Sequence, residues 1–256
     1  MRPGFMSSVC PQQTLPELIA TAQRHGYEGI EFRVEWNHAH GIELTASAQA
    51  LAEARRLLAE HGMAASCIAT SVKLNSADAS EHARQREALR HTIALASEVG
   101  APCVRTFADS LPEEDVAARE KVIAMAAESY ASVNDWAVGH GVTVLVETHT
   151  NMRAHWARQI LDAAQASALG VLWHIGHHTQ RGQTVDDAYR FIRGRVHHVH
   201  FTASQDDPHV TDADNRRMVA LLAADGFAGF LSVEIINPAD PEAVLRHHIA
   251  KYRAFQ

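Results

Sequence analysis

Four polar side chains interrupt apolar runs in the second half of the sequence, and all four are of types that bind metal ions. Glu147 ends the run VLVE, His174 lies in VLWHIG, His200 in VHHVHF and Glu234 in FLSVEI. A carboxylate or an imidazole in an apolar run is costly to bury without a partner, and four in succession suggest one shared partner. Two oxygen and two nitrogen ligands suit Zn, Mn, Co or Fe(II) better than Ca. We therefore predict that these residues bind one divalent transition metal ion.

Each of these residues has an ordinary alternative interpretation when it is taken alone. A single histidine is more often hydrogen-bonded within the fold than bound to a metal, and we interpret His197, His247 and His248 in that way. An ion pair with a neighbouring arginine would satisfy Glu147 or Glu234. The metal interpretation therefore depends on whether the four residues occupy equivalent positions in the fold.

The positions of the helices and strands are indicated by a pattern that recurs along the chain. An amphipathic helical stretch ends at a glycine, and a short β-rich run follows at once. The glycines that end these stretches are Gly26, Gly62, Gly100, Gly141, Gly170, Gly194 and Gly226. With an opening strand near residues 5–9, the pattern predicts strands near residues 29–33, 64–70, 102–107, 142–147, 171–175, 196–201 and 230–235. Helix starts agree, because Thr14 is followed by Glu17, and Thr184 by Asp187, as in N-terminal caps.

Apolar strands that alternate with helices, at about thirty residues per unit, predict one (β/α)8 barrel, the TIM-barrel class, over residues 1–256. An open doubly wound sheet is the alternative, but no glycine-rich phosphate loop follows the first strand. In such a barrel the chemistry lies at the C-terminal ends of the strands. Glu147, His174, His200 and Glu234 fall at the ends of strands five to eight. They should therefore converge at the mouth of the barrel.

Further polar residues fall at the same end of the barrel and are candidates for binding a substrate. Glu31 and Arg33 lie on the second strand, Arg105 on the fourth, and His149 two residues after Glu147. Arg105 could bind a substrate oxygen or carboxylate, or it could form an ion pair with Glu31 or Glu147 across the barrel. The loop after the second strand adds Trp36, His38 and His40, which could line the pocket or could belong to an exposed loop.

Composition favours a protein that acts on a small molecule. The formal charge of −7 argues against a protein that neutralises the phosphates of nucleic acid. The start MRPGFMSSVC lacks the apolar segment of a signal peptide, and no apolar run is long enough to predict a membrane span. Cys10, Cys67 and Cys103 are an odd, widely spaced set, so we expect reduced thiols in a cytoplasmic protein. The sequence leaves homo-oligomerisation open.

At these residues the chain resembles the xylose isomerase-like barrels, a superfamily of sugar isomerases and epimerases that also contains endonuclease IV. The resemblance covers essentially the whole chain and is carried by GIEFR, VRTF, VETH, WHIGH, HHVHF and SVEI, in that order. In the tagatose epimerase-like and inosose isomerase-like branches, the metal ligands come from strands five to eight. The resemblance implies Glu147, His174, His200 and Glu234 as ligands here, with His177 as a nearby substrate contact.

Two positions depart from the pattern of that family. The aspartate usual on strand six is His174 here, and the usual HxKD after strand seven reads HFTA, with Thr202 in place of the lysine. The first change could alter metal preference or remove a ligand, and the second removes a positive charge near the substrate. Asp207 and His209 match the spacing of a DxH motif in the endonuclease branch, although their loop is short.

The leading hypothesis is a metal-dependent isomerase or epimerase of a small sugar-like polyhydroxy carbonyl compound, acting through an enediolate. Glu147 and Glu234 would form the acid–base pair. The residues expected to orient the substrate are His177, Arg105, His149, Glu31 and Arg33.

Three alternatives stay open at this stage. A lyase or dehydratase could use the same enediolate to expel a β-hydroxyl group. A metal-dependent phosphodiesterase of the endonuclease IV kind is disfavoured by the acidic charge and by the absence of further ligands for three ions. A non-catalytic sugar-binding subunit would be consistent with the changes at His174 and Thr202.

Overall fold

Eight parallel strands form a closed barrel in the computed structural model, which describes residues 1–256. The strands are β1 (Arg2–Met6), β2 (Gly29–Arg33), β3 (Ala64–Lys73), β4 (Cys103–Phe107), β5 (Thr143–Glu147), β6 (Leu169–His174), β7 (Val196–Phe201) and β8 (Phe230–Val233). Each strand pairs with the next along the chain, and β1 pairs with β8 to close the ring. The predicted single (β/α)8 barrel is therefore confirmed.

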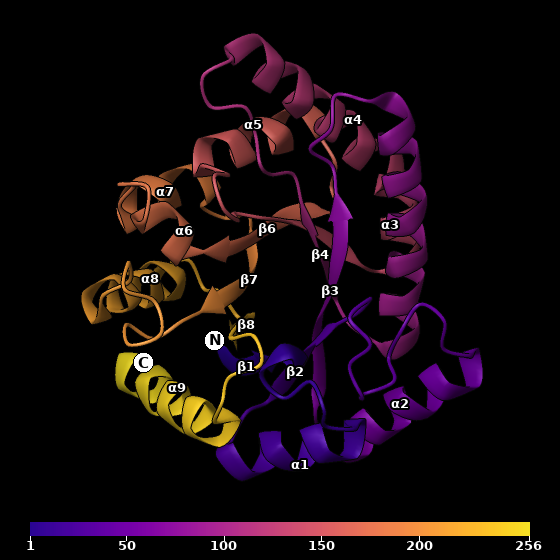
Figure 1. Cartoon of the computed structure of the whole chain (residues 1–256), viewed down its shortest axis with the longest axis vertical. Helices are drawn as coiled ribbons and strands as arrows, with labels where there is room; N and C mark the ends of the chain where they lie inside the picture. Colours follow the sequence, from indigo (N-terminus) through magenta and orange to yellow (C-terminus); the bar gives the residue numbers. More distant parts are fainter.

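Helices surround the barrel and join successive strands (Figure 1). They are α1 (Leu15–His25), α2 (Ala48–Glu60), α3 (Ala79–Val99), α4 (Val116–His140), α5 (Ala154–Ala164), α6 (Ile175–Thr179), α7 (Val185–Ile192), α8 (Asp212–Ala224) and α9 (Pro241–Phe255), with a 3-10 turn at Ser7–Val9. The predicted caps are present, because Thr14 and Glu17 form a capping box and the Thr184 hydroxyl accepts from the backbone N–H of Asp187. None of the helices has the length and apolar character needed to cross a membrane.

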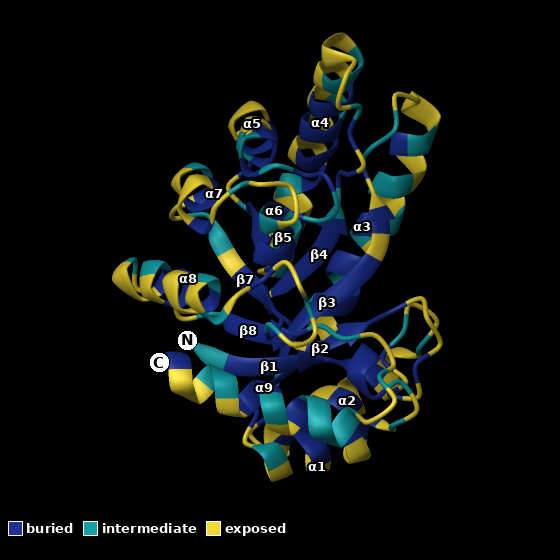
Figure 2. Ribbon diagram, turned by 60° about the vertical axis from the view of Figure 1, so that its left-hand side comes forward, coloured by how far each residue is buried: buried dark blue, intermediate teal, exposed yellow.

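The core lies between the strands and the inner faces of the helices. Figure 2 shows the strands almost entirely buried, while the helices alternate buried inner positions with exposed outer ones. One hydrophobic cluster of 66 residues connects the helices to the barrel. Cys10, Cys67 and Cys103 are buried and unpaired. The barrel is therefore a packed scaffold that fixes the ends of its strands.

The opening strand lies earlier than residues 5–9, where we predicted it. The strand is Arg2–Met6, and the chain turns at Ser7 into the 3-10 segment. The hydroxyl of Ser7 accepts the backbone N–H of Arg33 at 2.9 Å and lies 3.0 Å from Nδ1 of His38. These polar contacts end the strand because they bind Ser7 to the next strand and its loop.

Gly170 does not end a helix, contrary to the prediction. Helix α5 ends at Ala164, followed by Gln165 with a φ of 47°, and Gly170 is the second residue of β6. A Cβ at Gly170 would lie 2.3 Å from Cδ2 of His197, so the glycine permits close packing of β6 on β7. The other six predicted glycines have the expected positive φ, between 62° and 83°.

Candidate active site

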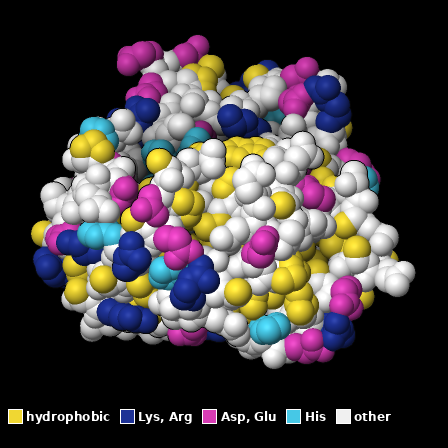
Figure 3. Space-filling model, turned by 60° about the horizontal axis from the view of Figure 1, so that its bottom comes forward, with side chains coloured by type: hydrophobic (Ala, Val, Ile, Leu, Met, Phe, Trp, Pro, Cys, Tyr) yellow, Lys and Arg dark blue, Asp and Glu magenta, His cyan; other side chains and the backbone are white.

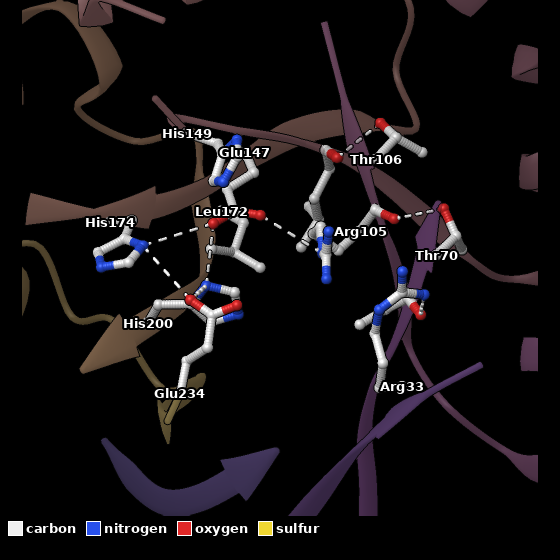
Figure 4. Close-up of polar contacts among 12 residues, drawn as sticks. Arg33, Thr70, Arg105, Thr106, Glu147, His149, Leu172, His174, His200 and Glu234 are labelled. Carbon is white, nitrogen blue, oxygen red and sulfur yellow. Dashed lines mark hydrogen bonds and ion pairs between the residues drawn. The ribbon is translucent and has the colours of Figure 1, made fainter. Parts of the chain in front are cut away.

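The four residues predicted to bind a metal come together at the C-terminal end of the barrel. Glu147 and His174 are the last residues of β5 and β6, His200 lies one residue before the end of β7, and Glu234 directly follows β8. One potential ligand atom from each lies within 4.8 Å of the others. Figure 4 shows the four side chains pointing toward one another. The cluster arises because neighbouring parallel strands end at the same rim.

His200 is the centre of this cluster. Its Nδ1 lies 3.0 Å from Oε1 of Glu147 and 2.9 Å from Oε2 of Glu234, while its Nε2 lies 3.1 Å from Oε1 of Glu31. Burial alone would lower the pKa of His200, but the three surrounding carboxylates outweigh burial and raise that pKa well above its usual value. Nδ1 of His200 therefore faces Glu147 and Glu234, and Nε2 faces Glu31 on the opposite side of the ring.

The two carboxylates of the cluster stay ionised. Burial would raise the pKa of Glu147, but attraction to His200 and Arg105 outweighs burial and holds this pKa well below its usual value. For Glu234, burial and the charge of Glu147 raise the pKa, yet attraction to His200 leaves it lowered overall. Both groups are consequently able to accept a proton or bind a cation at neutral pH.

The donor set fits a divalent metal ion. A buried atom of the cluster, Nδ1 of His174, has no hydrogen-bond partner. The imidazole Nδ1 of His174 lies 3.5 Å from one oxygen each of Glu147 and Glu234. Atoms that bind one ion at about 2.0–2.2 Å lie about 3.4 Å apart in a tetrahedral site. The nitrogen–oxygen distances in this cluster, from 2.9 to 3.5 Å, are close to that spacing.

Glu31, which we expected to contact the substrate, lies behind His200 and is fully buried. Its two carboxylate oxygens face Nε2 of His200 and Nε2 of His198, at 3.1 and 3.0 Å. Burial would lower the pKa of His198, but the charge of Glu31 raises that pKa to about 9. A carboxylate that holds the outer nitrogen of a metal-binding imidazole fixes its tautomer and orientation. Sequence reasoning did not detect these two contacts of Glu31.

Two arginines lie beside the cluster, on the β2 and β4 side of the barrel. Nε of Arg105 lies 3.4 Å from Oε2 of Glu147, so the bridge considered for this arginine is present. Arg105 also stacks on the ring of Phe107, 4.2 Å from its centre, and Arg33 stacks on Trp36 at 4.1 Å. Both guanidinium groups are almost fully buried, with about 3% of each side chain exposed.

His149 and His177 line the opening next to His174. The ring of His177, on α6, lies 4.2 Å from that of His174 and 4.8 Å from that of His149. Burial and then repulsion from the two neighbouring imidazoles lower the pKa of His177 to about 3, so this ring is neutral. Nδ1 of His149 contacts Oδ2 of Asp109 at 2.9 Å, and Thr150 also donates to that oxygen.

Asp109 is a site residue that the sequence analysis missed. It follows β4 by two residues, is 1% exposed and holds His149. The available signal was its position, since polar residues just beyond barrel strands line the mouth. Burial would lower the pKa of His149, but its bond to Asp109 and nearby carboxylates raise it.

Two of the three candidate side chains in the loop after β2 make contacts that hold the loop in place. His38 contacts Ser7, and Nδ1 of His40 accepts the backbone N–H of Ile42, so both buried rings serve the loop itself. Trp36 is 44% exposed, and its ring stacks on Arg33.

A cavity of about 380 Å³ lies at the opposite end of the barrel, near the starts of the strands, where Ser66, Cys103 and Phe230 line it. Over α1, α2 and α9, acidic and basic side chains are intermixed with apolar ones (Figure 3). That face therefore carries no continuous basic surface of the kind that binds nucleic acid.

The class defined by this fold and cluster is a (β/α)8 barrel with ligand-type residues at the ends of strands five to eight. The family model of the xylose isomerase-like TIM barrels matches residues 19–255. The chain therefore belongs to that family. Among curated proteins, no sequence matches this chain significantly.

Solved structures with the same fold include several sugar epimerases. An L-ribulose 3-epimerase has a TM-score of 0.80 at 20% identity, covering 99% of this chain and 94% of that chain. A 3-keto-D-glucoside 4-epimerase from E. coli has a TM-score of 0.80 at 15% identity, and the match covers 99% of both chains. The probable 3-DHS dehydratase of petrobactin synthesis from Bacillus anthracis has a TM-score of 0.77 at 16% identity, and the match again covers 99% of both chains. At these identities the likeness shows the fold alone.

Proposed function

We propose that this protein is a metal-dependent isomerase or epimerase of a small sugar-like polyhydroxy carbonyl compound. The observation that carries the proposal is the pair of ionised carboxylates, Glu147 and Glu234, both in contact with Nδ1 of His200 at the barrel mouth. A divalent ion held by Glu147, His174, His200 and Glu234 would stabilise the negative charge that develops on substrate oxygens when the α-proton leaves.

The chain's own residues supply the remaining requirements of this reaction. Glu147 and Glu234 approach the centre from β5 and from the end of β8, so that one can take a proton and the other can return it. The neutral ring of His177 and the anchored ring of His149 stand at the opening, where they can donate to or accept from substrate hydroxyl groups. Arg105 orients the substrate from the other side.

The comparisons support this proposal at a coarser level. Solved structures of the same fold include an L-ribulose 3-epimerase and a 3-keto-D-glucoside 4-epimerase, which act on sugar-like molecules. Only one group of metal-ligand type residues is present in the 256 residues, which favours chemistry with one metal ion. This argues against a phosphodiesterase that uses three ions.

The test is exchange of the substrate's α-proton with solvent. In deuterium oxide, wild-type protein loaded with Mn²⁺ should incorporate deuterium at the α-carbon of a ketose substrate. Glu147→Gln and Glu234→Gln should each reduce turnover by about 10²–10⁴-fold while the fold is retained. Glu242→Gln is the matched control, since Glu242 pairs with Arg24 and His25 on the outside of the barrel. Near-normal turnover in either site variant would refute the two-carboxylate assignment.

A lyase or dehydratase is the second candidate, because a probable dehydratase shares this fold over nearly its entire length. It would remove the same α-proton and then expel a β-hydroxyl group as water. Product analysis separates the two reactions: an isomerase or epimerase conserves the mass of its substrate, whereas a dehydratase product is lighter by one water.

A further inference from the structure

Arg105 carries a buried charge that has no hydrogen bond. Its side chain is 3% exposed, and its Nε and Nη1 have neither a partner nor accessible surface. Buried guanidinium groups normally donate to carboxylates or carbonyls, because an unpaired buried charge is strongly destabilising. The Nε and Nη1 groups of Arg105 can therefore donate to an acceptor that the protein chain does not provide.

The neighbours of Arg105 do not accept a hydrogen bond from its Nε or Nη1. Phe107 covers one face of its guanidinium group, with 4.2 Å between the Cζ atom and the ring centre. The nearest carboxylate oxygen, Oε2 of Glu147, is 3.4 Å from Nε and forms no hydrogen bond with it. Glu147 is also the residue assigned to bind metal and move protons, so its charge is shared with the cluster.

A second guanidinium group, that of Arg33, lies nearby and adds positive charge that an anion would neutralise. Arg33 donates from Nη1 to the carbonyl of Ala69 at 3.1 Å and from Nη2 to the hydroxyl of Ser71 at 2.6 Å, which leaves Nε buried without a partner. Burial and then repulsion from Arg105 lower the pKa of Arg33 to about 10. Glu35 balances Arg33 in part, with 3.8 Å between the closest atoms. Figure 4 shows Arg105 between Glu147 and Arg33.

We propose that Arg105, supported by Arg33, binds an oxyanion of the substrate, so that the reacting molecule is an anionic α-hydroxycarbonyl compound and not a neutral sugar. A planar guanidinium group matches the two oxygens of a carboxylate and also binds phosphate. The 3.4 Å between Arg105 and Glu147 places the anionic group next to the reacting carbons. This inference rests on the proposed function, because it assigns the substrate class of the same site.

Three compounds with the same three-carbon ketose skeleton provide the probes: dihydroxyacetone is neutral, hydroxypyruvate carries a carboxylate, and dihydroxyacetone phosphate carries a phosphate. Binding of each to the Mn²⁺-loaded protein is measured by calorimetry. We expect one or both anions to bind about 10- to 100-fold more tightly than dihydroxyacetone, the range for a hydrogen-bonded charge pair. The tighter of the two anions identifies the oxyanion.

Arg105→Met keeps the length of the side chain and removes its charge. It should reduce the affinity for the anionic probes by about 10- to 100-fold and that for dihydroxyacetone far less, because only the anionic probes lose a charged hydrogen bond. Arg181→Gln is the matched control, because Arg181 is an exposed arginine that pairs with Glu113. Arg105→Lys keeps the charge and should retain part of the anion preference.

Equal binding of all three probes by wild type would overturn the proposal, as would an Arg105→Met variant that keeps its preference for anions. If Arg105→Met does not fold, the affinities of Arg105→Lys and wild type for the anionic probes are compared instead. An unchanged affinity in Arg105→Lys counts against the proposal. Deuterium exchange tests the proposed function separately. Exchange without anion preference refutes only the substrate class, and anion preference that depends on Arg105 without exchange refutes only the reaction.

Discussion

Replacing Glu31 by glutamine tests whether the residue behind His200 controls metal binding. Both oxygens of the Glu31 carboxylate face imidazole nitrogens, at 3.0 and 3.1 Å, in a fully buried position. Glutamine has nearly the same shape, but its amide offers one oxygen, and its NH₂ group would oppose the second N–H donor. Glu31→Gln should therefore lose one charged hydrogen bond, a loss of about 1.5–3 kcal/mol.

The consequence for the metal follows from the tautomer of His200. The Glu31 carboxylate holds the proton on Nε2, so Nδ1, which faces Glu147 and Glu234, is the nitrogen that would lose its proton and bind the ion. Loss of such support weakens metal affinity by about 10- to 100-fold, or about 1.4–2.8 kcal/mol. Calorimetric titration of the metal-free protein with Mn²⁺ and Zn²⁺ measures the change directly.

The same variant should unfold more easily. A loss of about 1.5–3 kcal/mol lowers the melting temperature of a chain of this size by about 3–12 °C. The pKa of His198 is raised from 6.5 to about 9, so its pairing with Glu31 contributes fully below pH 6.5 and is lost as pH rises through about 9. The stability deficit of Glu31→Gln should therefore shrink toward alkaline pH.

His198→Asn separates the two effects. His198 bonds to Glu31 and has one neighbour among the four candidate ligands, His200, with 6.2 Å between the two ring centres. This control should destabilise the fold and leave metal affinity near that of wild type. Wild-type metal affinity in Glu31→Gln, or an equal loss of affinity in both variants, would refute the orienting role of Glu31.

Three further predictions concern the metal and the opening of the site. A chelator should lower the melting temperature of purified protein, because an ion at about 100 times its Kd stabilises the fold by about 2.7 kcal/mol, and an unchanged melting curve with chelator and with added Mn²⁺ or Zn²⁺ would contradict this. His174→Asp should shift metal preference toward Mn²⁺ or Mg²⁺, since it adds a negative charge and a harder ligand, and indistinguishable affinities of the two proteins across Zn²⁺, Mn²⁺ and Mg²⁺ would exclude His174 as a ligand. Asp109→Asn should lower kcat by about 10-fold with little change in metal affinity, because His149 loses its charged partner, and steady-state kinetics together with metal titration check this.

The barrel and the cluster of ligand-type residues were predictable because local patterns determine them. Each strand end follows from an apolar run, and the alternation of side chains along a strand places Glu147 on the inner face. Once the barrel closes, equivalent strand ends meet at one rim, so four separate local inferences become one cluster. No contact between distant residues had to be guessed.

The errors arose where packing between strands decides the outcome. Gly170 looks like the end of a helix because a strand follows it at once, but its role is to admit the ring of His197 from the neighbouring strand. Ser7 belongs to an apolar opening run, yet its hydroxyl binds the backbone of Arg33 and bends the chain. Neither neighbour can be read from the local sequence.

Glu31 shows the same limit at the site itself. It lies on β2 and contacts His200 on β7, 169 residues away, although these strands are not adjacent in the barrel. The contact crosses the interior, so it depends on the tilt of the strands and on which residues share a layer, which periodicity does not specify. Sequence reasoning can place a carboxylate on the inner face of a barrel, but only the closed structure shows whether it faces the mouth or supports a ligand from behind. The residues that would orient the proposed metal ligands are therefore the part of such a site that needs three-dimensional information.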